Sequence, residues 1–220
     1  MLIKIRGDSV KKILALILIS ITIFGCGKED SPEAALNEIQ IALAERDSQK
    51  LSARADLDEF FSETYDATTI ELAKKYDEYK EKYPDDPYFQ HSSEFLTEYN
   101  AANRENHLKF LDGVKESYFA KIPEPATPEE NPTAYVANEF EKIRQAANVT
   151  VKETVINDNQ ATIILDVVGD NSLRGMFIGQ MTFKLGFRKE NERWHFDEIK
   201  NLDELTPALV DKAEIIWVNL

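Results

Sequence analysis

Residues 149–168, V-T-V-K-E-T-V-I-N-D-N-Q-A-T-I-I-L-D-V-V, decide the fold class of this chain. Before this stretch apolar residues recur at spacings of three and four, which is typical of helices, whereas within it the period switches to two. Asp158 and Asn159 separate the two runs and are typical of a tight turn. The stretch therefore predicts an antiparallel strand hairpin that follows a helical N-terminal half.

The residues after this hairpin continue the two-residue period. Residues 176–188, M-F-I-G-Q-M-T-F-K-L-G-F-R, predict a third strand, and residues 194–200, W-H-F-D-E-I-K, predict a fourth. Two interpretations stay open for the apolar inner positions, a packed core or the lining of a pocket for an apolar ligand. The candidate pocket lining is Phe177, Met181, Phe183, Trp194 and Phe196.

Helices are predicted at both ends of the domain. Ser31 has the side chain of a helix N-cap, and Pro32 suits the first helical position, so a helix begins at these residues. Near the other end, Thr206 and Pro207 predict a short closing helix within residues 205–220.

A helical hairpin is predicted from the pattern between these ends. Residues 57–65 predict a short helix, and residues 68–83 predict a longer, charged helix that Y-P-D-D-P-Y ends. Asp86 as N-cap and Pro87 as first helical residue predict the start of a partner helix that reaches about Ala120. The two long helices are expected to pack antiparallel.

A proline-rich linker is predicted after the hairpin. Residues 122–132 contain four prolines and three acidic residues, which favours an extended, solvated chain. Residues 133–147 then predict one more helix before the first strand.

The order of these elements resembles the nuclear transport factor 2-like or cystatin-like α+β cone. The four strands end in W-x-F-x-x-I, and residues 42–57, A-L-A-E-R-D-S-Q-K-L-S-A-R-A-D-L, are similar to the start of many bacterial envelope domains of this kind. The resemblance covers about residues 31–66 and 133–202. It implies an α+β fold with N-terminal helices packed on a curved, cone-like, four-stranded antiparallel sheet, elaborated by a helical insertion at about 68–120. The superfamily contains isomerases, dehydratases and non-catalytic modules, so the resemblance implies no single activity.

The N-terminus has the pattern of a secretory leader. Residues 1–12 carry a charge of +3, and residues 13–24 are apolar apart from Ser20 and Thr22. A positive segment before a short apolar block is typical of a signal peptide. A helix needs about 20 apolar residues to cross the hydrocarbon core, so this block is too short for a comfortable anchor.

The end of this leader, Ile23-Phe24-Gly25-Cys26, resembles the lipobox of bacterial lipoproteins. The resemblance implies that residues 1–25 are removed, that Cys26 carries a diacylglycerol and an acyl chain such as palmitate, and that residues 26–30 form a lipidated tether of about 15 Å. Residues 31–220 then form a single domain on the extracytoplasmic side of the cell membrane or outer membrane. The alternatives are a buried thiol in a retained helix and a signal peptide cut elsewhere.

The composition restricts the function classes. A hydrophobic content of 43% with twelve phenylalanines predicts a folded core. The chain carries −14 at pH 7, or −17 once the positive leader is lost, which argues against nucleic acid as a partner. Cys26 is the only cysteine, so disulfides and thiolate metal sites are not expected.

The sequence contains no established catalytic or cofactor motif. His91, His107 and His195 lack the short spacing of metal ligands, so no metal or cofactor is expected. The favoured hypothesis is a lipid-anchored, non-catalytic binding module of the cell envelope, attached to the bilayer through acylated Cys26. An envelope protein or a small apolar ligand is its expected partner.

A second hypothesis is an isomerase- or dehydratase-type enzyme with its site inside the cone. Such a site needs a carboxylate or a tyrosine hydroxyl among apolar side chains. The acids that could enter a cone are Asp58, Asp166 and Glu198, although surface positions are more typical of such residues.

Overall fold

The computed structural model describes residues 30–86, 89–121 and 127–219. The predicted leader, Cys26 and most of the tether lie outside the described residues. The helices are α2 (Pro32–Glu45), α3 (Ser48–Ser52), α4 (Leu57–Lys82), α5 (Ser93–Phe119), α6 (Pro132–Gln145), α7 (Leu173–Ile178) and α8 (Leu202–Asn219). Within the described part of the chain, no helix is long and apolar enough to cross a membrane.

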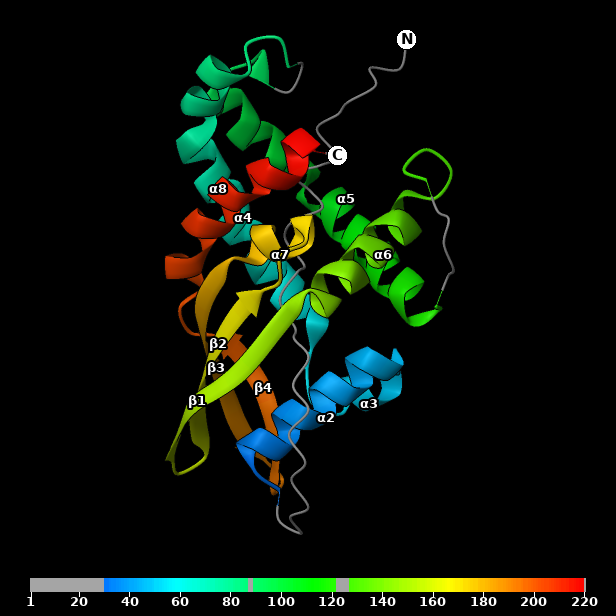
Figure 1. Cartoon of the computed structure of the whole chain (residues 1–220), viewed down its shortest axis with the longest axis vertical. Coiled ribbons are helices and arrows are strands. Elements are labelled where there is room, and N and C mark those ends of the chain that lie inside the picture. Colours follow the sequence, from blue (N-terminus) through cyan, green and yellow to red (C-terminus); the bar gives the residue numbers. More distant parts are fainter. Residues whose placement is uncertain (1–29, 87–88, 122–126, 220) are drawn as a thin grey trace.

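The strands form one open antiparallel sheet, which confirms the α+β fold class. They are β1 (Ala147–Asn157), β2 (Gln160–Gly169), β3 (Gln180–Glu190) and β4 (Arg193–Ile199), in the order β1-β2-β3-β4. The predicted turn joins β1 to β2, where Asn157 pairs with Gln160 and Asp158 adopts a left-handed φ of 54°. In Figure 1 the sheet lies at the lower left, and the paired helices α4 and α5 extend to the opposite, upper end.

The predicted inner positions of the sheet are buried. Alternate residues of β2 and β3 face the helices and form the main core with α2, α4, α5, α6 and α8. The most buried inner residues of the sheet are Ala161, Ile163, Leu165, Val167, Phe183, Leu185 and Phe187. The period of two therefore identified the buried face correctly.

The N-terminal helix begins as predicted. Ser31 has an extended backbone, and its hydroxyl accepts a hydrogen bond from Ala34 N at 3.1 Å, while Pro32 occupies the first turn. The predicted helix at 133–147 is α6, which starts one residue earlier because Asn131 caps it.

Two helix boundaries differ from the prediction in the hairpin. Residues 57–65 and 68–83 belong to one continuous helix, α4, because neither Gly nor Pro interrupts residues 57–82. Its partner α5 begins at Ser93 instead of beside Asp86, since the Ser92 hydroxyl accepts from Phe95 N at 3.1 Å and caps the helix there. The antiparallel pairing itself is confirmed, because Tyr65 contacts His107 while Lys80 donates to His91 O.

The third strand is shorter than predicted. Its expected first residues, beginning at Met176, belong to the short helix α7. Gly179 ends that helix with φ of 58°, a left-handed conformation that glycine adopts without strain, and β3 begins after it. The alternating pattern alone could not reveal this interruption.

Two further expectations are corrected near the linker and the C-terminus. Of the predicted linker at 122–132, residues 122–126 lie outside the described residues, and Thr127 to Asn131 form a turn instead of an extended chain, with Asn131 N donating to Thr127 O at 3.0 Å. The closing helix α8 starts before the predicted Thr206-Pro207 boundary, because Asn201 O accepts from the backbone N–H groups of the first turn. Pro207 therefore lies inside the helix.

A second, smaller cluster lies at the far end of the helical hairpin. It joins α4, α5 and α8 to the segment between the two hairpin helices. Its buried members are Leu72, Tyr76, Tyr79, Phe89, Leu96 and Val210.

Candidate functional site

The described residues enclose a polar cleft of about 680 Å³. It lies among α3, the first turn of α4, the last turns of α5, and the adjoining ends of β3 and β4. This volume is within the range of small-molecule sites, which is about 300–1,000 Å³. Its lining includes Leu51, Ser52, Asp56, Asp58, Glu59, Glu116, Arg188, Glu190, His195, Phe196 and Asp197.

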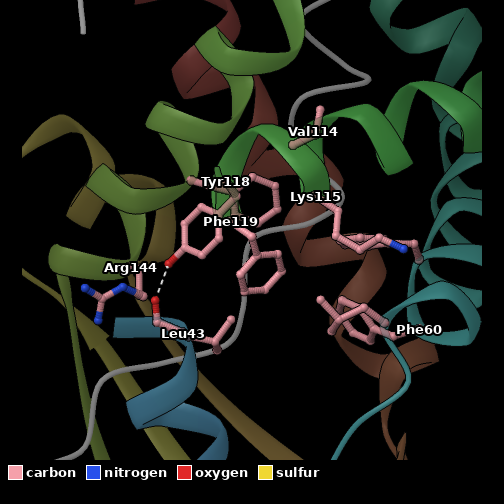
Figure 2. Close-up of a pocket in the computed structure, with 10 residues that line it drawn as sticks. Leu43, Phe60, Val114, Lys115, Tyr118, Phe119 and Arg144 are labelled. Atoms are coloured by element: carbon pink, nitrogen blue, oxygen red, sulfur yellow. Dashed lines mark hydrogen bonds between the residues drawn. The ribbon is translucent and has the colours of Figure 1, made fainter. Parts of the chain in front are cut away.

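A small apolar recess of about 50 Å³ adjoins this cleft. The side chains of Leu57, Lys115 and Phe119 belong to the walls of both cavities. Figure 2 shows the ring of Phe119, the last residue of α5, between Tyr118, Leu43 and Phe60. The remaining walls of the recess are Phe61, Val114, Phe140 and Arg144.

A short segment before α4 positions the cleft against the edge of the sheet. Phe196 N of the edge strand β4 donates to Arg54 O at 2.8 Å, so the chain at Arg54 lies along that edge. Two residues later Asp56 caps α4, because its carboxylate accepts from Asp58 N at 2.9 Å. Leu57 therefore enters the shared wall at the first position of α4.

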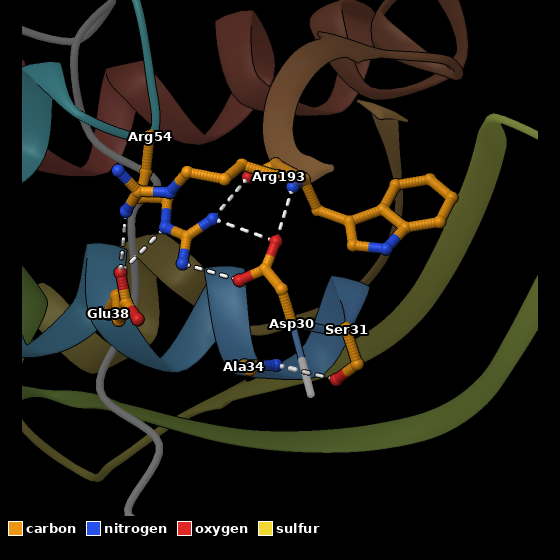
Figure 3. A network of polar contacts seen from close by, with 7 residues as sticks. Asp30, Ser31, Ala34, Glu38, Arg54 and Arg193 are labelled. Carbon is orange, nitrogen blue, oxygen red and sulfur yellow. Dashed lines mark hydrogen bonds and ion pairs between the residues drawn. The ribbon is translucent and has the colours of Figure 1, made fainter. Parts of the chain in front are cut away.

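The side chain of Arg54 fixes this segment to three parts of the chain (Figure 3). Its guanidinium, with 3% of the side chain exposed, donates to Asp30 at 2.5 and 3.0 Å, to Glu38 at 2.6 Å and to Trp194 O at 2.9 Å. The hydrogen bond to Glu38 is the main cause that raises the pKa of Arg54 above its ordinary value. A buried, permanently charged side chain thus fixes the segment that leads into α4.

Negative charge predominates in the cleft. Its lining contains six carboxylates and two cationic side chains, Lys115 and Arg188. Both cations are already paired, Lys115 with Asp58 and with Asp112 at 3.2 Å, and Arg188 with Glu190 at 3.0 Å. The site therefore favours a cationic ligand over an anionic one.

The ion pairs also set the protonation state of Lys115. Burial alone would lower the pKa of its ammonium group, but hydrogen bonds to Asp58 and Asp112 outweigh this effect and the pKa is raised. Lys115 is therefore protonated at neutral pH and does not act as a base.

The polar atoms nearest the recess are engaged with the protein. The hydroxyl of Tyr118 donates to Leu43 O at 2.8 Å and lies 2.9 Å from Glu141 Oε2, while Arg144 forms a two-pronged pair with Glu141 at 2.7 and 2.9 Å. Burial, reinforced by Glu141, raises the pKa of Tyr118 above its ordinary value. This phenol remains neutral, and its hydroxyl is engaged by Leu43 O and Glu141.

The predicted pocket lining lies mostly in the core. Phe177, Met181, Phe183 and Trp194 are buried in the main cluster and belong to neither of the two cavities. Phe196 is also buried, yet it contributes to the wall of the polar cleft. The candidate lipid-attachment residue Cys26 lies outside the described residues.

The other candidates from the sequence are dispersed. Asp58 lines the cleft with its side chain 66% exposed, whereas Asp166 pairs with Lys152 at 3.2 Å and Glu198 is exposed on β4. His195 is the one histidine in the cleft. Among residues 30–86, 89–121 and 127–219, no group of three or more His, Cys, Asp or Glu side chains could hold a metal ion.

Sequence reasoning did not identify the residues shared by the two cavities. Leu57 begins one helix and Phe119 ends another, so their proximity depends on how α4 and α5 pack. Arg54 gave a weak signal as a charged residue between two alanines, but its partners are up to 140 positions away.

Known proteins give no further guidance to this site. A comparison of the chain with protein-family models, curated proteins and solved structures finds no match.

Proposed function

We propose that this protein is a lipid-anchored, extracytoplasmic binding module of the bacterial cell envelope. Cys26 carries the lipid, and the cleft beside β4 holds the ligand. The observation that supports binding at this place is the apolar recess, which shares the side chains of Leu57, Lys115 and Phe119 with a cleft of ligand-binding size. The positive, short apolar leader and the lipobox-like residues 23–26 support the anchor.

The two cavities select a ligand with two chemical parts. The recess, at about 50 Å³, is much smaller than a benzene-binding cavity of about 150 Å³, so it accepts a short branched aliphatic group instead of a ring. The cleft adds an excess of carboxylates next to this recess. A cationic group on a short apolar chain matches both cavities, because the apolar chain fits the recess and the cation faces the carboxylates of the cleft. The ligand is either a small amine or a side chain of a peptide.

Two small probes with the same carbon skeleton test this proposal. The probes are 3-methylbutylammonium and 4-methylpentanoate, which differ in the sign of their charge. Added to residues 26–220 with Cys26→Ser, the ammonium probe is expected to shift the amide signals of Leu57, Lys115 and Phe119 in NMR spectra. The carboxylate probe is expected to shift them less. Equal shifts from both probes, or shifts confined to other residues, would contradict the ligand class.

A matched pair of phenylalanines on α5 tests the place of binding. Phe119→Ala removes a shared wall of the two cavities, whereas Phe110→Ala removes a half-buried ring that belongs to neither. Only the first variant is expected to change the affinity for the ammonium probe. The anchor is tested separately, since Cys26→Ser in the full chain is expected to move the protein from the membrane fraction to the soluble fraction.

A further inference from the structure

The root of the proposed tether is held rigidly against the domain. Asp30 is the first described residue, and its carboxylate accepts from the Arg54 guanidinium and from Trp194 N at 2.6 Å. The next residue, Ser31, caps α2. The chain therefore leaves the fold at a fixed point beside the start of β4.

Two strand turns lie at the same end of the molecule as Asp30. The contact of Asp30 with Trp194 N places the β3–β4 turn there, and Thr154 of β1 lies near Glu33 in the first turn of α2. Figure 1 shows the start of α2 and both turns at the lower end of the long axis, opposite the far end of the α4–α5 hairpin.

This end exposes apolar side chains on the β1–β2 hairpin. Val155 is 39% exposed and Ile156 is 52% exposed. Neighbouring residues of a strand point to opposite faces of a sheet, so exposure of both means that the hairpin projects beyond the helices that cover the inner face. Bulky apolar residues at such a tip are suited to contact with a lipid interface.

The length of chain outside the structure decides which end is near the bilayer. The chain from Cys26 to Asp30 spans at most about 15 Å even when fully extended. Helix α4 alone has 26 residues and is about 39 Å long. A lipid on Cys26 thus keeps the Asp30 end close to the membrane, and an upright domain holds the far hairpin end beyond the reach of the bilayer.

We propose that the end of the molecule formed by Asp30, the β1–β2 turn and the β3–β4 turn faces the lipid bilayer, with Val155 and Ile156 in contact with its interface. This inference rests on the proposed lipidation of Cys26. The Asp30–Arg54 contact fixes the orientation, so the far end of the α4–α5 hairpin projects away from the membrane. The charged residues at the turns have both signs, among them Asp158, Glu192 and Arg193, so contact comes from the tether and the apolar tip.

Site-specific fluorescence on the lipidated full-length protein tests this orientation. The chain has one cysteine, so in protein acylated at Cys26 an introduced cysteine is the only free thiol. Ile156→Cys and Phe95→Cys place an environment-sensitive dye at the two ends, at residues that are 52% and 45% exposed. The proteins are placed in vesicles of phosphatidylethanolamine and phosphatidylglycerol that contain a lipid with a nitroxide on its headgroup.

The dye at residue 156 is expected to lose fluorescence when the nitroxide lipid is present, and the dye at residue 95 to keep it. Equal quenching at both residues would mean that the domain lies on its side, and quenching at 95 alone would mean that it is inverted; either result overturns the proposal. Quenching at neither residue overturns it as well. If the dye at 156 responds to protein concentration without vesicles, the hairpin contacts a second copy of the chain and the proposal is wrong.

The Asp30–Arg54 contact and the lipid anchor at Cys26 are tested by separate measurements. Asp30→Asn in the Ile156→Cys background is expected to decrease quenching at 156, because the tether root is no longer held by a charged pair. Unchanged quenching would show that the Asp30–Arg54 contact does not fix the orientation. Flotation of the full chain with vesicles, against the Cys26→Ser variant, reports the anchor alone, so a protein that floats without quenching at 156 disproves the orientation and leaves the lipidation intact.

Discussion

The two apolar clusters of this molecule are built differently. The main core lies between the sheet and several helices and consists mostly of aliphatic and phenylalanine side chains. The far cluster contains few residues and is mostly aromatic. The rings of Tyr76 and Phe89 are tilted by 59° with centroids 5.4 Å apart, and the Tyr76 hydroxyl accepts from His91 N at 3.0 Å. The main core therefore stabilises the whole fold, and the far cluster is expected to open locally at a lower free energy.

Truncation of one buried phenylalanine in each cluster provides the strongest test of this difference. Phe183 in the main core is 1% exposed and Phe89 in the far cluster is 0% exposed. Phe183→Ala is expected to lower the free energy of unfolding by about 3–5 kcal/mol, measured by chemical denaturation, because it leaves a cavity under the sheet.

Phe89→Ala is expected to act locally instead. Hydrogen exchange is expected to accelerate at the amides of residues 76–86 and 89–96, while those of β2 and β3 keep their protection. If the strand amides lost protection equally in Phe89→Ala, the two clusters would form one cooperative unit and the distinction would be wrong.

The sequence could predict those element boundaries that a few local residues determine. The strand hairpin was predictable because Asp158 and Asn159 supply turn chemistry between two strand patterns, and the start of α2 because Ser31 and Pro32 act within one helical turn. The start of β3 was not predictable, because Phe177 fits the alternating apolar pattern of the strand although it belongs to the helix α7. Local chemistry fixes such boundaries only where a single residue type is required.

The candidate site was harder to predict than the fold. Its shared walls come from the opposite ends of two helices, and neither Leu57 nor Phe119 differs in its local sequence from an ordinary core residue. The inner strand residues Phe183 and Trp194 gave a clearer apolar signal, yet they fill the core. Periodicity identifies what is buried, whereas a cavity depends on how well the packed elements fit together.

The ion pairs of the two ends differ in burial and therefore in expected strength. Arg54 has a side chain that is 3% exposed, while Arg104, which pairs with Asp66 at 2.8 Å on the hairpin, is 41% exposed. Arg54→Leu is expected to lower the free energy of unfolding by about 3 kcal/mol, because it leaves the partly buried Asp30 unpaired.

Arg104→Leu serves as the matched variant and is expected to cost clearly less stability than Arg54→Leu in the same denaturation measurement, because water screens an exposed ion pair. Similar losses of unfolding free energy in the two variants would show that burial does not make the Arg54 ion pairs stronger than the Arg104 ion pair. Arg54→Lys is expected to restore only part of the stability, since one ammonium cannot reproduce the fork that reaches Asp30, Glu38 and Trp194 O.

The acid sensitivity of the tether root gives a smaller effect of known sign. Burial would raise the pKa of Asp30, but hydrogen bonds from Arg54 and Trp194 N together with the nearby positive charges lower it below its ordinary value of 3.8. A carboxylate with a lowered pKa stabilises the folded state above about pH 4, and this contribution is lost as the pH falls below that value. Asp30→Asn is therefore expected to flatten the decline in stability between pH 5 and about pH 3, followed by thermal melting.

Asp77→Asn is the control for this pH dependence, because Asp77 is an exposed carboxylate on α4. Its variant is expected to keep the wild-type acid profile. An unchanged profile in Asp30→Asn would show that other carboxylates dominate the acid sensitivity.

Tyr65 lies at the border of the two regions and gives the smallest predicted effect. It belongs to the main core, yet its hydroxyl lies 2.6 Å from Nδ1 of His107 on the hairpin helix α5. Burial raises the pKa of Tyr65 to about 12, so its stabilising contribution is complete below pH 10 and is lost as the pH rises toward 12. Tyr65→Phe keeps the ring and removes the hydroxyl, and we expect a loss of about 1 kcal/mol at neutral pH. If hydrogen exchange in this variant accelerates on α5 but not on β2 or β3, the hydroxyl couples the hairpin to a core that is stable without it; equal acceleration would place Tyr65 within the cooperative unit of the sheet.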